Sequence, residues 1–273
     1  MKQFWTDVLE FSEEIAAHVA VKLLQDFGQV QAEVKTDKSL VTQSDKWADK
    51  TITEALASKF PEHGILSEET THIFPDTEWC WIIDPIDGTT NFTRGVPLWG
   101  ISLALLYQGM PVFGYVYFPP IDQAFHAFCG QALEMEAPDN KAYLNQRQLQ
   151  PSQDEPSNNH FFNLCARSTE VIVRSPNFPC KIRMLGAATY NLLTVAAGIA
   201  LGAVEATPKI WDISAVWAIA QAAGASWVPL NGETLFPLKP GEDYSTKNYP
   251  TLVASREELI PLFKPLVEFV ANR

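Results

Sequence analysis

The sequence predicts an α/β fold, and three of its features support that class. From residue 161 onward, short apolar strand patterns alternate with helical patterns, which is typical of α/β organisation. The first 136 residues carry two helical patterns followed by a run of strand patterns. Hydrophobic residues make up 47% of the 273 residues and charged residues 19%, so the chain can bury a sizeable core.

The first half begins with an amphipathic helix, because apolar residues from Phe4 to Val19 recur at helical spacing. Gly28 is the expected stop of this helix, and Pro61 is the expected stop of the next one. A turn at Gly109 separates two long strand patterns. The predicted elements are helices over 4–27 and from 44 or 45 to 60, strands over 64–69 and 78–84, two strands within 98–120, and a strand-rich stretch to about residue 136.

A polar stretch over residues 135–160 separates the two halves and is the expected boundary region. We therefore divide the chain into an N-terminal subdomain, residues 1–140, and a C-terminal subdomain, residues 141–273, within one compact unit. The elements predicted in the second half are strands over 161–165, 181–185, 203–207 and 251–255, and helices over 188–198, 212–224 and 256–272.

The formal net charge is −12 and the sequence pI is about 4.8. Such a chain repels a nucleic-acid backbone unless it carries a local basic patch, and no run of Lys or Arg supplies one. No nucleic-acid partner is therefore expected. If the substrate is a phosphate, bound cations are the obvious means of attracting it.

The chain is expected to be cytoplasmic and without a membrane partner. Its first 24 residues carry acidic side chains where a signal peptide needs an apolar region, and its longest apolar stretch, 192–204, is too short to span a bilayer. The four cysteines have neither C-x-x-C nor zinc-finger spacing and are interpreted as reduced packing residues.

The stretch "WIIDPIDGTTNF", residues 81–92, carries the first candidate site. Asp84 ends a buried strand, where ligands of open α/β sheets commonly bind, and Asp87 lies close enough to share a hard cation such as Mg²⁺. Gly88 lets the backbone approach a ligand. Thr89 and Thr90 could open a helix whose free N–H groups face a phosphate.

Three other interpretations of this motif can be compared with a metal site; one remains open, and the residue spacing excludes two. A plain Asp-Gly turn followed by a helix cap is as compatible with the isolated motif as a metal site is. An EF-hand is excluded, because the twelfth position from Asp84 is Gly95 rather than Glu. The haloacid-dehalogenase phosphatase motif is also excluded, because its two aspartates are one residue apart, whereas Pro85 and Ile86 intervene here.

Three further acidic elements are candidates, each with a simpler structural explanation. Glu68 and Glu69 follow a predicted strand and either lie on a solvated surface or reach the same crevice as Asp84. Asp212 starts a helix and is either an N-cap or a metal ligand that also faces outward. Asp45 is either a first-turn acid or a base partner for a threonine hydroxyl.

Taken together, these elements resemble the inositol monophosphatase family of Mg²⁺-dependent phosphatases. The resemblance covers most of the chain, from about Lys35 to the C-terminal helix. It rests on three motifs in the family's order: "SEE" at 67–69, "WIIDPIDGTTNF" at 81–92 and "WDISAVWAIAQAAGA" at 211–225.

The resemblance implies a layered αβαβα sandwich with an α+β N-terminal half, and a homodimer. It also implies Mg²⁺-dependent, lithium-sensitive hydrolysis of a small phosphorylated polyol, most simply inositol monophosphate. The expected ligands of two Mg²⁺ ions, with Glu68 also helping a weaker third, are Glu68, Asp84, the Ile86 carbonyl, Asp87 and Asp212.

The remaining roles also follow from the resemblance. Thr89 is expected to orient the attacking water and Asp45 to polarise the Thr89 hydroxyl, with Glu68 as the third catalytic residue. The expected phosphate-binding residues are Gly88, Thr89 and Thr90, and the expected substrate-binding residues are Glu205 and Ala188.

Some residues depart from the family pattern or have no settled role. Ser67 replaces the usual glycine, and Lys209 adds a cation near the leaving group where a histidine is common. The short segment 70–77 predicts a more open site. Glu69 and Lys35 lie in the motifs without an assigned role.

Two other functions remain open. The pattern "KTDKSLVTQSD" at 35–45 also resembles histidinol-phosphate and nucleotide phosphatases of the same superfamily, so histidinol phosphate or a sugar bisphosphate is an alternative substrate. A metal-bound interaction or regulatory protein is the alternative of another class.

Overall fold

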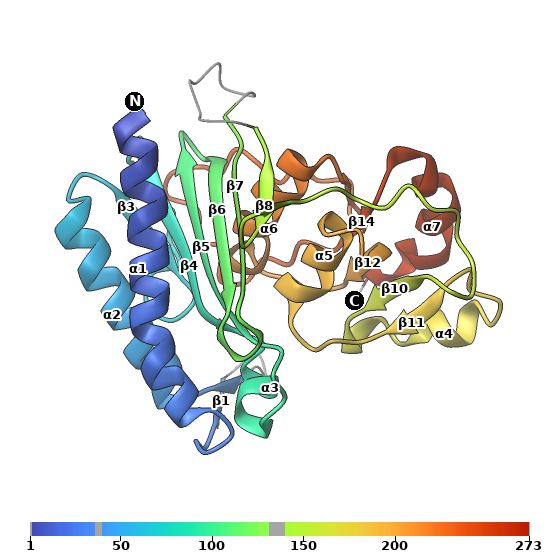
Figure 1. Cartoon of the computed structure of the whole chain (residues 1–273), viewed down its shortest axis with the longest axis horizontal. Helices are drawn as coiled ribbons and strands as arrows, with labels where there is room; N and C mark the ends of the chain where they lie inside the picture. The colour runs from blue at the N-terminus through green and yellow to red at the C-terminus, as the bar shows by residue number, and fades with distance from the viewer. Residues whose placement is uncertain (1, 36–39, 131–139, 273) are drawn as a thin grey trace.

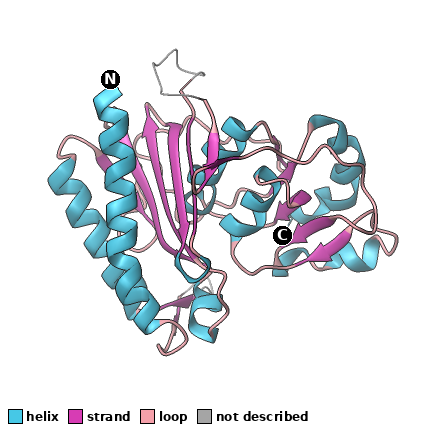
Figure 2. Ribbon diagram, viewed as in Figure 1, coloured by secondary structure: helices cyan, strands magenta, loops and turns pink. Residues whose placement is uncertain are grey.

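A computed structural model of the chain describes residues 2–35, 40–130 and 140–272. Helices and sheets alternate in five layers, which run from left to right in Figures 1 and 2. Two N-terminal helices cover a large sheet, two helices lie between this sheet and a smaller one, and further helices cover the far side. The predicted α/β class and αβαβα layering are confirmed.

The large sheet has seven strands in the order β3-β4-β5-β6-β7-β8-β9 and is antiparallel except for the β3–β4 pair. Its strands are β3 (Gly64–Ser67), β4 (Trp79–Asp87), β5 (Gly100–Tyr107), β6 (Met110–Phe118), β7 (Gln123–Phe128), β8 (Ala142–Leu144) and β9 (Arg147–Gln148).

Side chains of the central strands alternate between two cores, as the two-residue period of a strand requires. Leu103 and Leu105 of β5 pack with the outer helices α1 (Lys2–Asp26) and α2 (Gln43–Lys59), whereas Ala104 and Leu106 face the middle layer. Both faces of this sheet are therefore buried, which explains why β4 and β5 are nearly continuous apolar runs.

The middle layer consists of α5 (Ala188–Ala196) and α6 (Ile210–Ala223). Helix α6 lies across β4 to β7, and its backbone approaches β6 very closely at Gly114. A Cβ atom at Gly114 would lie only 2.3 Å from the carbonyl oxygen of Ala215. A side chain at this position would therefore keep α6 away from the sheet.

The small sheet has the strand order β11-β10-β12-β14-β13. Strands β10 and β12 run parallel as neighbours, so their carboxyl ends meet at one edge of the sheet. Its strands are β10 (Phe161–Leu164), β11 (Lys181–Arg183), β12 (Ala200–Glu205), β13 (Ser226–Pro229) and β14 (Thr251–Ala254). The remaining elements are β1 (Glu33–Val34), β2 (Leu40–Val41), α3 (Thr89–Arg94), α4 (Glu170–Arg174) and α7 (Ile260–Val267).

The structure confirms the long predicted elements and corrects several ends. Strand β4 continues to Asp87, three residues beyond the predicted end, because β5 still pairs with it there after a register shift. The predicted helix 256–272 is a shorter α7 with 3₁₀ turns at Glu257–Leu259 and Glu268–Asn272. Strands β8 and β9, which the polar composition hid, join the large sheet just beyond the proposed 140/141 boundary. The predicted strand character of residues 131–136 lies outside the described residues.

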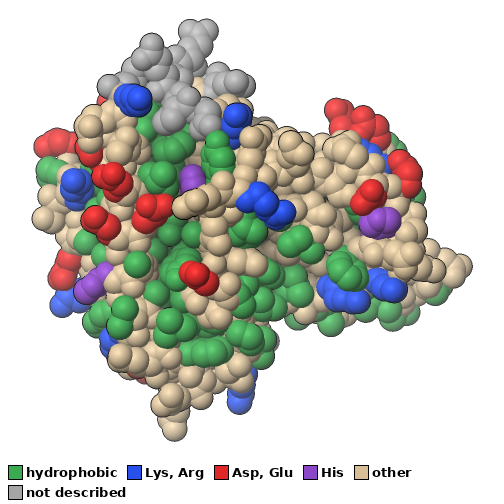
Figure 3. Space-filling view, viewed as in Figure 1, with side chains coloured by type: hydrophobic (Ala, Val, Ile, Leu, Met, Phe, Trp, Pro, Cys, Tyr) green, Lys and Arg blue, Asp and Glu red, His purple; other side chains and the backbone are tan. Residues whose placement is uncertain are grey.

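Among the described residues, no helix combines the length and the apolar character needed to cross a bilayer. All four cysteines are free thiols. Cys80, Cys129 and Cys180 are buried, whereas Cys165 is half-buried and lines the cavity described below. On the face drawn in Figure 3, Lys and Arg side chains occur singly or in small groups between acidic and neutral ones. The bulk charge does not supply an anion site on this face.

Candidate active site

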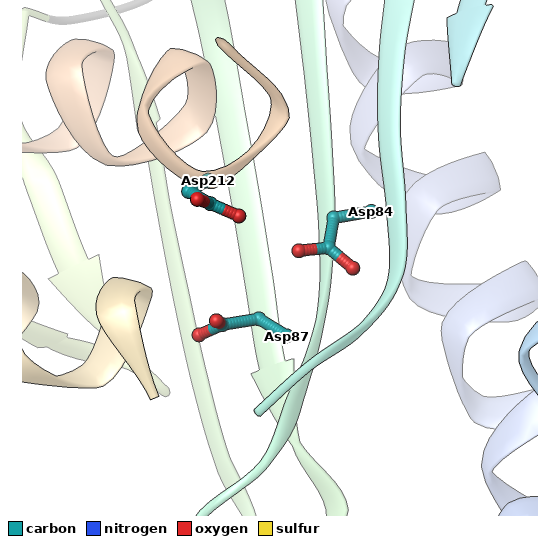
Figure 4. Close-up of side chains that lie close together, drawn as sticks. All are labelled: Asp84, Asp87 and Asp212. Atoms are coloured by element: carbon teal, nitrogen blue, oxygen red, sulfur yellow. The ribbon is translucent and has the colours of Figure 1, made fainter. Parts of the chain in front are cut away.

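Three aspartates from distant parts of the chain converge between the large sheet and the middle layer. Asp84 and Asp87 come from the end of β4, and Asp212 comes from the first turn of α6; Figure 4 shows their carboxylates facing a common space. Each offers a carboxylate oxygen, and these oxygens all lie within 4.8 Å of one another. The arrangement is compact enough for one or more small cations.

The end of β4 fixes the first carboxylate. The Ile86 N–H donates to Asp84 Oδ1 at 3.0 Å, so the turn through Pro85 holds this side chain from its own backbone. The Asp84 side chain is only 1% exposed. The predicted position of Asp84 on a buried strand is therefore confirmed, although the strand continues to Asp87.

Asp87 lies at the N-terminus of α5, a helix that begins 101 residues further along the chain. The backbone N–H groups of Ala188 and Thr189 donate to its two carboxylate oxygens at 3.1 and 2.9 Å, and the Thr189 hydroxyl also donates to it. The N-terminus of a helix favours a negative charge. The predicted Ala188 is thus brought to the site, and Thr189 is a site residue that the local sequence did not reveal.

Asp212 is the third residue of α6 rather than its N-cap. Its Oδ2 accepts the backbone N–H of Lys209 at 2.7 Å, as the acidic residue of a capping box does. The same carboxylate belongs to the aspartate cluster. The N-cap alternative for Asp212 is therefore wrong, and its capping-box contact leaves the carboxylate within the aspartate cluster.

Glu68 lies beside this cluster, at the turn after β3. Its carboxylate interacts with Asp84, and Lys35 Nζ donates to it at 2.9 Å. The same ammonium donates to Glu69 at 2.7 Å. Glu69 thus faces Lys35, and the lysine offsets the repulsion between the two neighbouring glutamates.

A buried carboxylate behind the "SEE" turn was not foreseen. Asp49 of α2 is 0% exposed and accepts hydrogen bonds from the hydroxyls of Ser67 and Thr70, the latter at 2.9 Å. Ser67 in turn accepts the Glu69 N–H at 3.3 Å. The Ser67 hydroxyl therefore links Asp49 of α2 to the backbone of Glu69, a contact that a glycine at this position could not make.

The Thr89 hydroxyl lies between two acceptors, Asp45 Oδ1 at 3.2 Å and the Ile86 carbonyl at 3.1 Å. Asp45 is a first-turn acid of α2 and also accepts the N–H and hydroxyl of the N-cap Thr42. Burial raises the pKa of Asp45, although these hydrogen bonds oppose the rise. The predicted pairing of Asp45 with Thr89 is present in the geometry.

Gly88 precedes α3 in a left-handed conformation, with φ of 86°. A Cβ there would meet Ala187 and the carbonyl oxygen of Leu98 at 3.1 Å. Glycine is therefore required both by the backbone conformation and by the close packing. The first N–H groups of the helix, from Thr89 and Thr90, follow at this turn beside the aspartates.

Glu205 ends β12 on the opposite side of the site and is 5% exposed. Asn191 of α5 donates to its Oε1 at 2.6 Å, and the Cys165 thiol also bonds to it. Burial raises the pKa of Glu205 to about 7, with the Asp87 charge adding to the rise. Glu205 is therefore not a solvent-exposed acid at the end of the strand but a buried one that faces the cavity.

Most of these groups line one open cavity of about 810 Å³, but Asp45, Asp49, Ser67, Glu69 and Thr189 are not among its lining residues. It contains the three aspartates and Glu68 on one side, which we call the inner wall. Residues from the loops after β10 and β12 form the other side. The predicted residues that line it are Lys35, Glu68, Asp84, Ile86, Asp87, Gly88, Thr89, Thr90, Ala188, Glu205, Lys209 and Asp212.

The electrostatics of the inner wall favour a cation. Burial raises the pKa of Asp84 and of Asp212 well above the usual range of aspartate, and mutual repulsion with Asp87 and Glu68 adds to both rises. Burial likewise raises the pKa of Glu68 to about 7, opposed by Lys35. Bound divalent cations would remove this repulsion, and an all-oxygen donor set suits Mg²⁺. The residues present therefore fit the predicted metal.

A model of the inositol monophosphatase family matches residues 5–261. The chain belongs to the inositol monophosphatase family. It is 29% identical over 268 residues to a Nus factor SuhB of Pasteurella multocida, with 92% of each chain covered. It is 31% identical over 237 residues to a fructose-1,6-bisphosphatase/inositol-1-monophosphatase of Thermotoga maritima, covering 83% of this chain and 86% of the other.

Among solved structures, an inositol monophosphatase of Thermotoga maritima superposes with a TM-score of 0.78 at 27% identity, with 97% of each chain covered. The chain is accordingly a phosphatase of the inositol monophosphatase family, and its buried aspartate cluster fits metal binding. The names of its relatives span several substrates, so membership alone does not define the ester.

Several residues in or next to the site could not be recognised from the sequence around them. Thr189 and Asn191 reach the site because the start of α5 lies at the end of β4. Asp49, on α2, bonds to Ser67 in the turn behind the site. Arg167 and Thr207 line the cavity from loops whose sequences match none of the three motifs. The parallel pairing of β10 with β12 is the one fact that would have placed these two residues together.

Proposed function

We propose that this chain is a Mg²⁺-dependent phosphomonoesterase that hydrolyses a small phosphorylated polyol, with inositol monophosphate as the first substrate to test. The observation that carries the proposal is the convergence of Asp84, Asp87 and Asp212 beside the Gly88–Thr89 turn. Two Mg²⁺ ions held by the inner wall and the Ile86 carbonyl, with a third near Glu68, would activate a water and neutralise the phosphate and leaving oxygens.

The chain's own groups supply orientation. The Thr89 hydroxyl donates a hydrogen bond to Asp45 or to the Ile86 carbonyl. The lone pairs of the Thr89 oxygen then accept a hydrogen bond from the attacking water. The free N–H groups at the start of α3, from Gly88 to Thr90, face an oxyanion of the phosphate.

The substrate end is assigned to groups opposite the cluster. Glu205 is held by Asn191 and accepts hydroxyls of the polyol, and Ala188, at the start of α5, lines the same cavity. Lys209 approaches the leaving-group side, with its ammonium donating to the Ser245 carbonyl at 2.8 Å. A homodimer, inhibition by Li⁺ and a cytoplasmic location complete the proposal by analogy with the family.

The test is phosphate release from inositol 1-phosphate as Mg²⁺ is titrated, with a chelator as the blank. Asp212→Asn keeps an oxygen that can accept the Lys209 N–H, so the helix start survives while the ligand charge is lost. We expect release only with Mg²⁺ and a loss of on the order of 10³-fold in kcat/KM in the variant. Full activity in the chelator would contradict the proposal.

One alternative within the phosphatases is a sugar bisphosphate or histidinol phosphate as the preferred ester. It is supported by the name of the Thermotoga maritima relative, a fructose-1,6-bisphosphatase/inositol-1-monophosphatase. Ranking these esters by kcat/KM on the Mg²⁺-loaded enzyme decides between them, because the metal core is common to all.

The alternative of another class is a metal-bound interaction protein, supported by the relative named as a Nus factor. Every proposed catalytic group is present in this chain, which favours the enzyme. A partner that stays bound when Asp84 and Asp212 are both replaced by Asn, in a chain that hydrolyses none of the esters, would favour the alternative.

A further inference from the structure

A second cavity lies at the end of α6 that is remote from the aspartate cluster. It is an open pocket of about 450 Å³, bounded by the last two turns of α6, by β13 and by the loop that follows β13. It shares no lining residue with the catalytic cavity. We call it the tryptophan pocket, and the lining residues that matter below are Trp217, Gln221, Trp227, Glu233 and Phe236.

The walls of the tryptophan pocket are held by contacts of the fold. The loop after β13 is attached to the large sheet by the Leu238 N–H, which donates to the Gly109 carbonyl at 2.9 Å. A Cβ atom at Gly109 would lie 2.3 Å from the Leu238 carbonyl oxygen, so the two segments are in close contact. On the pocket side, the ring centroids of Trp217 and Phe236 lie 5.2 Å apart. The aromatic surface is therefore formed by the fold itself.

Trp217 and Trp227 are both half-buried, so part of each indole remains accessible from the pocket. Elsewhere the chain covers such a ring with a cation of its own: Lys22 Nζ lies 5.5 Å from the centroid of the half-buried Trp47 ring. Among the described residues, no ammonium or guanidinium lies over the ring of Trp217 or of Trp227. The faces of these two indoles are thus available to a cation from outside the chain.

The charge around the pocket also favours a cation. Among the described residues that line it, Glu233 alone is charged, and this exposed carboxylate forms no ion pair with any of them. Lys247 interacts with the charge of Glu233 but forms its ion pair with Glu242 and does not line the pocket. Gln221 lies in the last turn of α6, where the helix dipole favours positive charge.

We infer that the tryptophan pocket binds a small organic cation, an alkylated ammonium. Its alkyl groups contact the faces of the tryptophan rings, which attract a cation, and Glu233 supplies the opposite charge. A bare metal ion fits less well, because it requires several oxygen ligands and the aromatic walls offer none. This site lies apart from the reacting phosphate and goes beyond the proposed function.

The test compares two molecules of the same shape that differ in charge. Choline carries a trimethylammonium group, and 3,3-dimethylbutan-1-ol carries a tert-butyl group in its place. Each is titrated calorimetrically into the full chain, with and without saturating Mg²⁺ and inorganic phosphate, which compete for the catalytic cavity. We expect a Kd for choline on the order of 1 mM in both conditions, and binding of the neutral alcohol at least about tenfold weaker.

Three variants locate the binding. Trp217→Leu and Trp227→Leu keep an apolar side chain and remove the ring, and at least one of them should raise the Kd for choline by about tenfold or more. Glu233→Gln should raise it by roughly threefold, because an exposed charge contributes less. Glu62→Gln, an exposed acid in the turn after α2 and outside the pocket, is the matched control and should leave the Kd unchanged.

Several results would overturn the inference. They are no saturable binding of choline, equal Kd values for choline and the alcohol, or a Kd for choline that none of the three pocket variants alters. Loss of choline binding when Mg²⁺ and phosphate are added would place the cation at the aspartates instead. Melting curves check that the variants fold, and Glu233→Gln decides if both leucine variants do not. Because no ester is hydrolysed in these titrations, failure of the proposed function leaves this test intact.

Discussion

On the inner wall, Asp84 is 1% exposed and Asp87 is 6% exposed, and each is held by backbone N–H groups. The opposite side of the cavity, which we call the outer wall, is lined by Arg167, Thr207 and Lys209. Arg167 is exposed, and its guanidinium donates a hydrogen bond to the Thr207 hydroxyl. The aspartates of the inner wall come from strand β4 and from the first turn of α6, whereas the residues of the outer wall come from the segments after β10 and β12. From this difference we expect the metal chemistry at the buried wall and contacts with the rest of the substrate at the exposed one.

The largest effect is expected from the inner wall itself. Asp84→Asn removes one charge from the centre of the cluster, and activity should fall by on the order of 10³-fold in kcat/KM at any Mg²⁺ concentration. Asp76→Asn, an exposed aspartate in the loop before β4, is the matched control and should keep full activity. Steady-state kinetics with both variants checks this, and equal activities would remove the inner wall from the mechanism.

Thr89→Val should cost roughly 10²-fold in kcat, because the side chain keeps its shape and loses the hydroxyl that orients water. KM and the Mg²⁺ requirement should change little, since Thr89 contributes no charge. Thr93→Val, on the same short helix and half-buried, is the control, because its hydroxyl bonds only to the Thr90 carbonyl of its own helix. A variant with normal kcat would show that the Asp45–Thr89 contact is structural only.

Ser67→Ala tests support behind the inner wall. It removes the hydroxyl that links Asp49 to the glutamate turn, and Glu68 should then be positioned less well. We expect the Mg²⁺ concentration for half-maximal activity to rise by roughly 10-fold, with kcat at saturating Mg²⁺ nearly unchanged. An unaltered Mg²⁺ titration would limit the Ser67 hydroxyl to a role in folding.

The smallest effect concerns stability and pH. The pKa values of Glu68 and Glu205 rise from the ordinary 4.5 to about 7, so the folded metal-free protein keeps protons that the unfolded chain has already lost. Its free energy of unfolding should therefore fall as pH rises from 4.5 to 7 and stay low above that range. Melting curves of metal-free protein at pH 5.5 and 8 should show a decrease of a few degrees.

Two additions to this experiment isolate the cause. Mg²⁺ should raise the melting temperature more at pH 8 than at pH 5.5, because it competes with protons for the same oxygens. Glu205→Gln keeps an oxygen for the Asn191 bond and should make the pH dependence shallower. A metal-free protein that is more stable at pH 8 would contradict the electrostatic description of the cluster.

The same contrast explains what the sequence could predict. The pair Asp84 and Asp87 was predictable because strand pattern, turn and helix start lie within 12 consecutive residues. Asp212 was predictable as a ligand only through the family's motif order, since a helix-start acid by itself is ambiguous. The layered αβαβα arrangement was predictable only through the resemblance to the inositol monophosphatase family, whereas the apolar patterns indicated the individual strands and helices.

Other groups depend on tertiary pairing, which a single sequence does not display. Thr189 donates to Asp87 across 102 positions, and Arg167 meets Thr207 only because β10 and β12 are adjacent strands. Strands β8 and β9 have only three and two residues and lie within a polar stretch, so they are too short to show the alternation that marks a half-buried strand. Asp49 resembled any polar residue of a surface helix until α2 was seen against the "SEE" turn.

Gly114 has no side chain and lies on β6, which supplies none of the clustered aspartates, yet it sets the distance between α6 and the large sheet. Ala215, whose carbonyl rests on Gly114, follows Asp212 by a single helical turn. A methyl group at residue 114 would lift α6 and carry Asp212 away from its partners on β4. The distance between Asp212 and the aspartates of β4 therefore depends on there being no Cβ atom at residue 114.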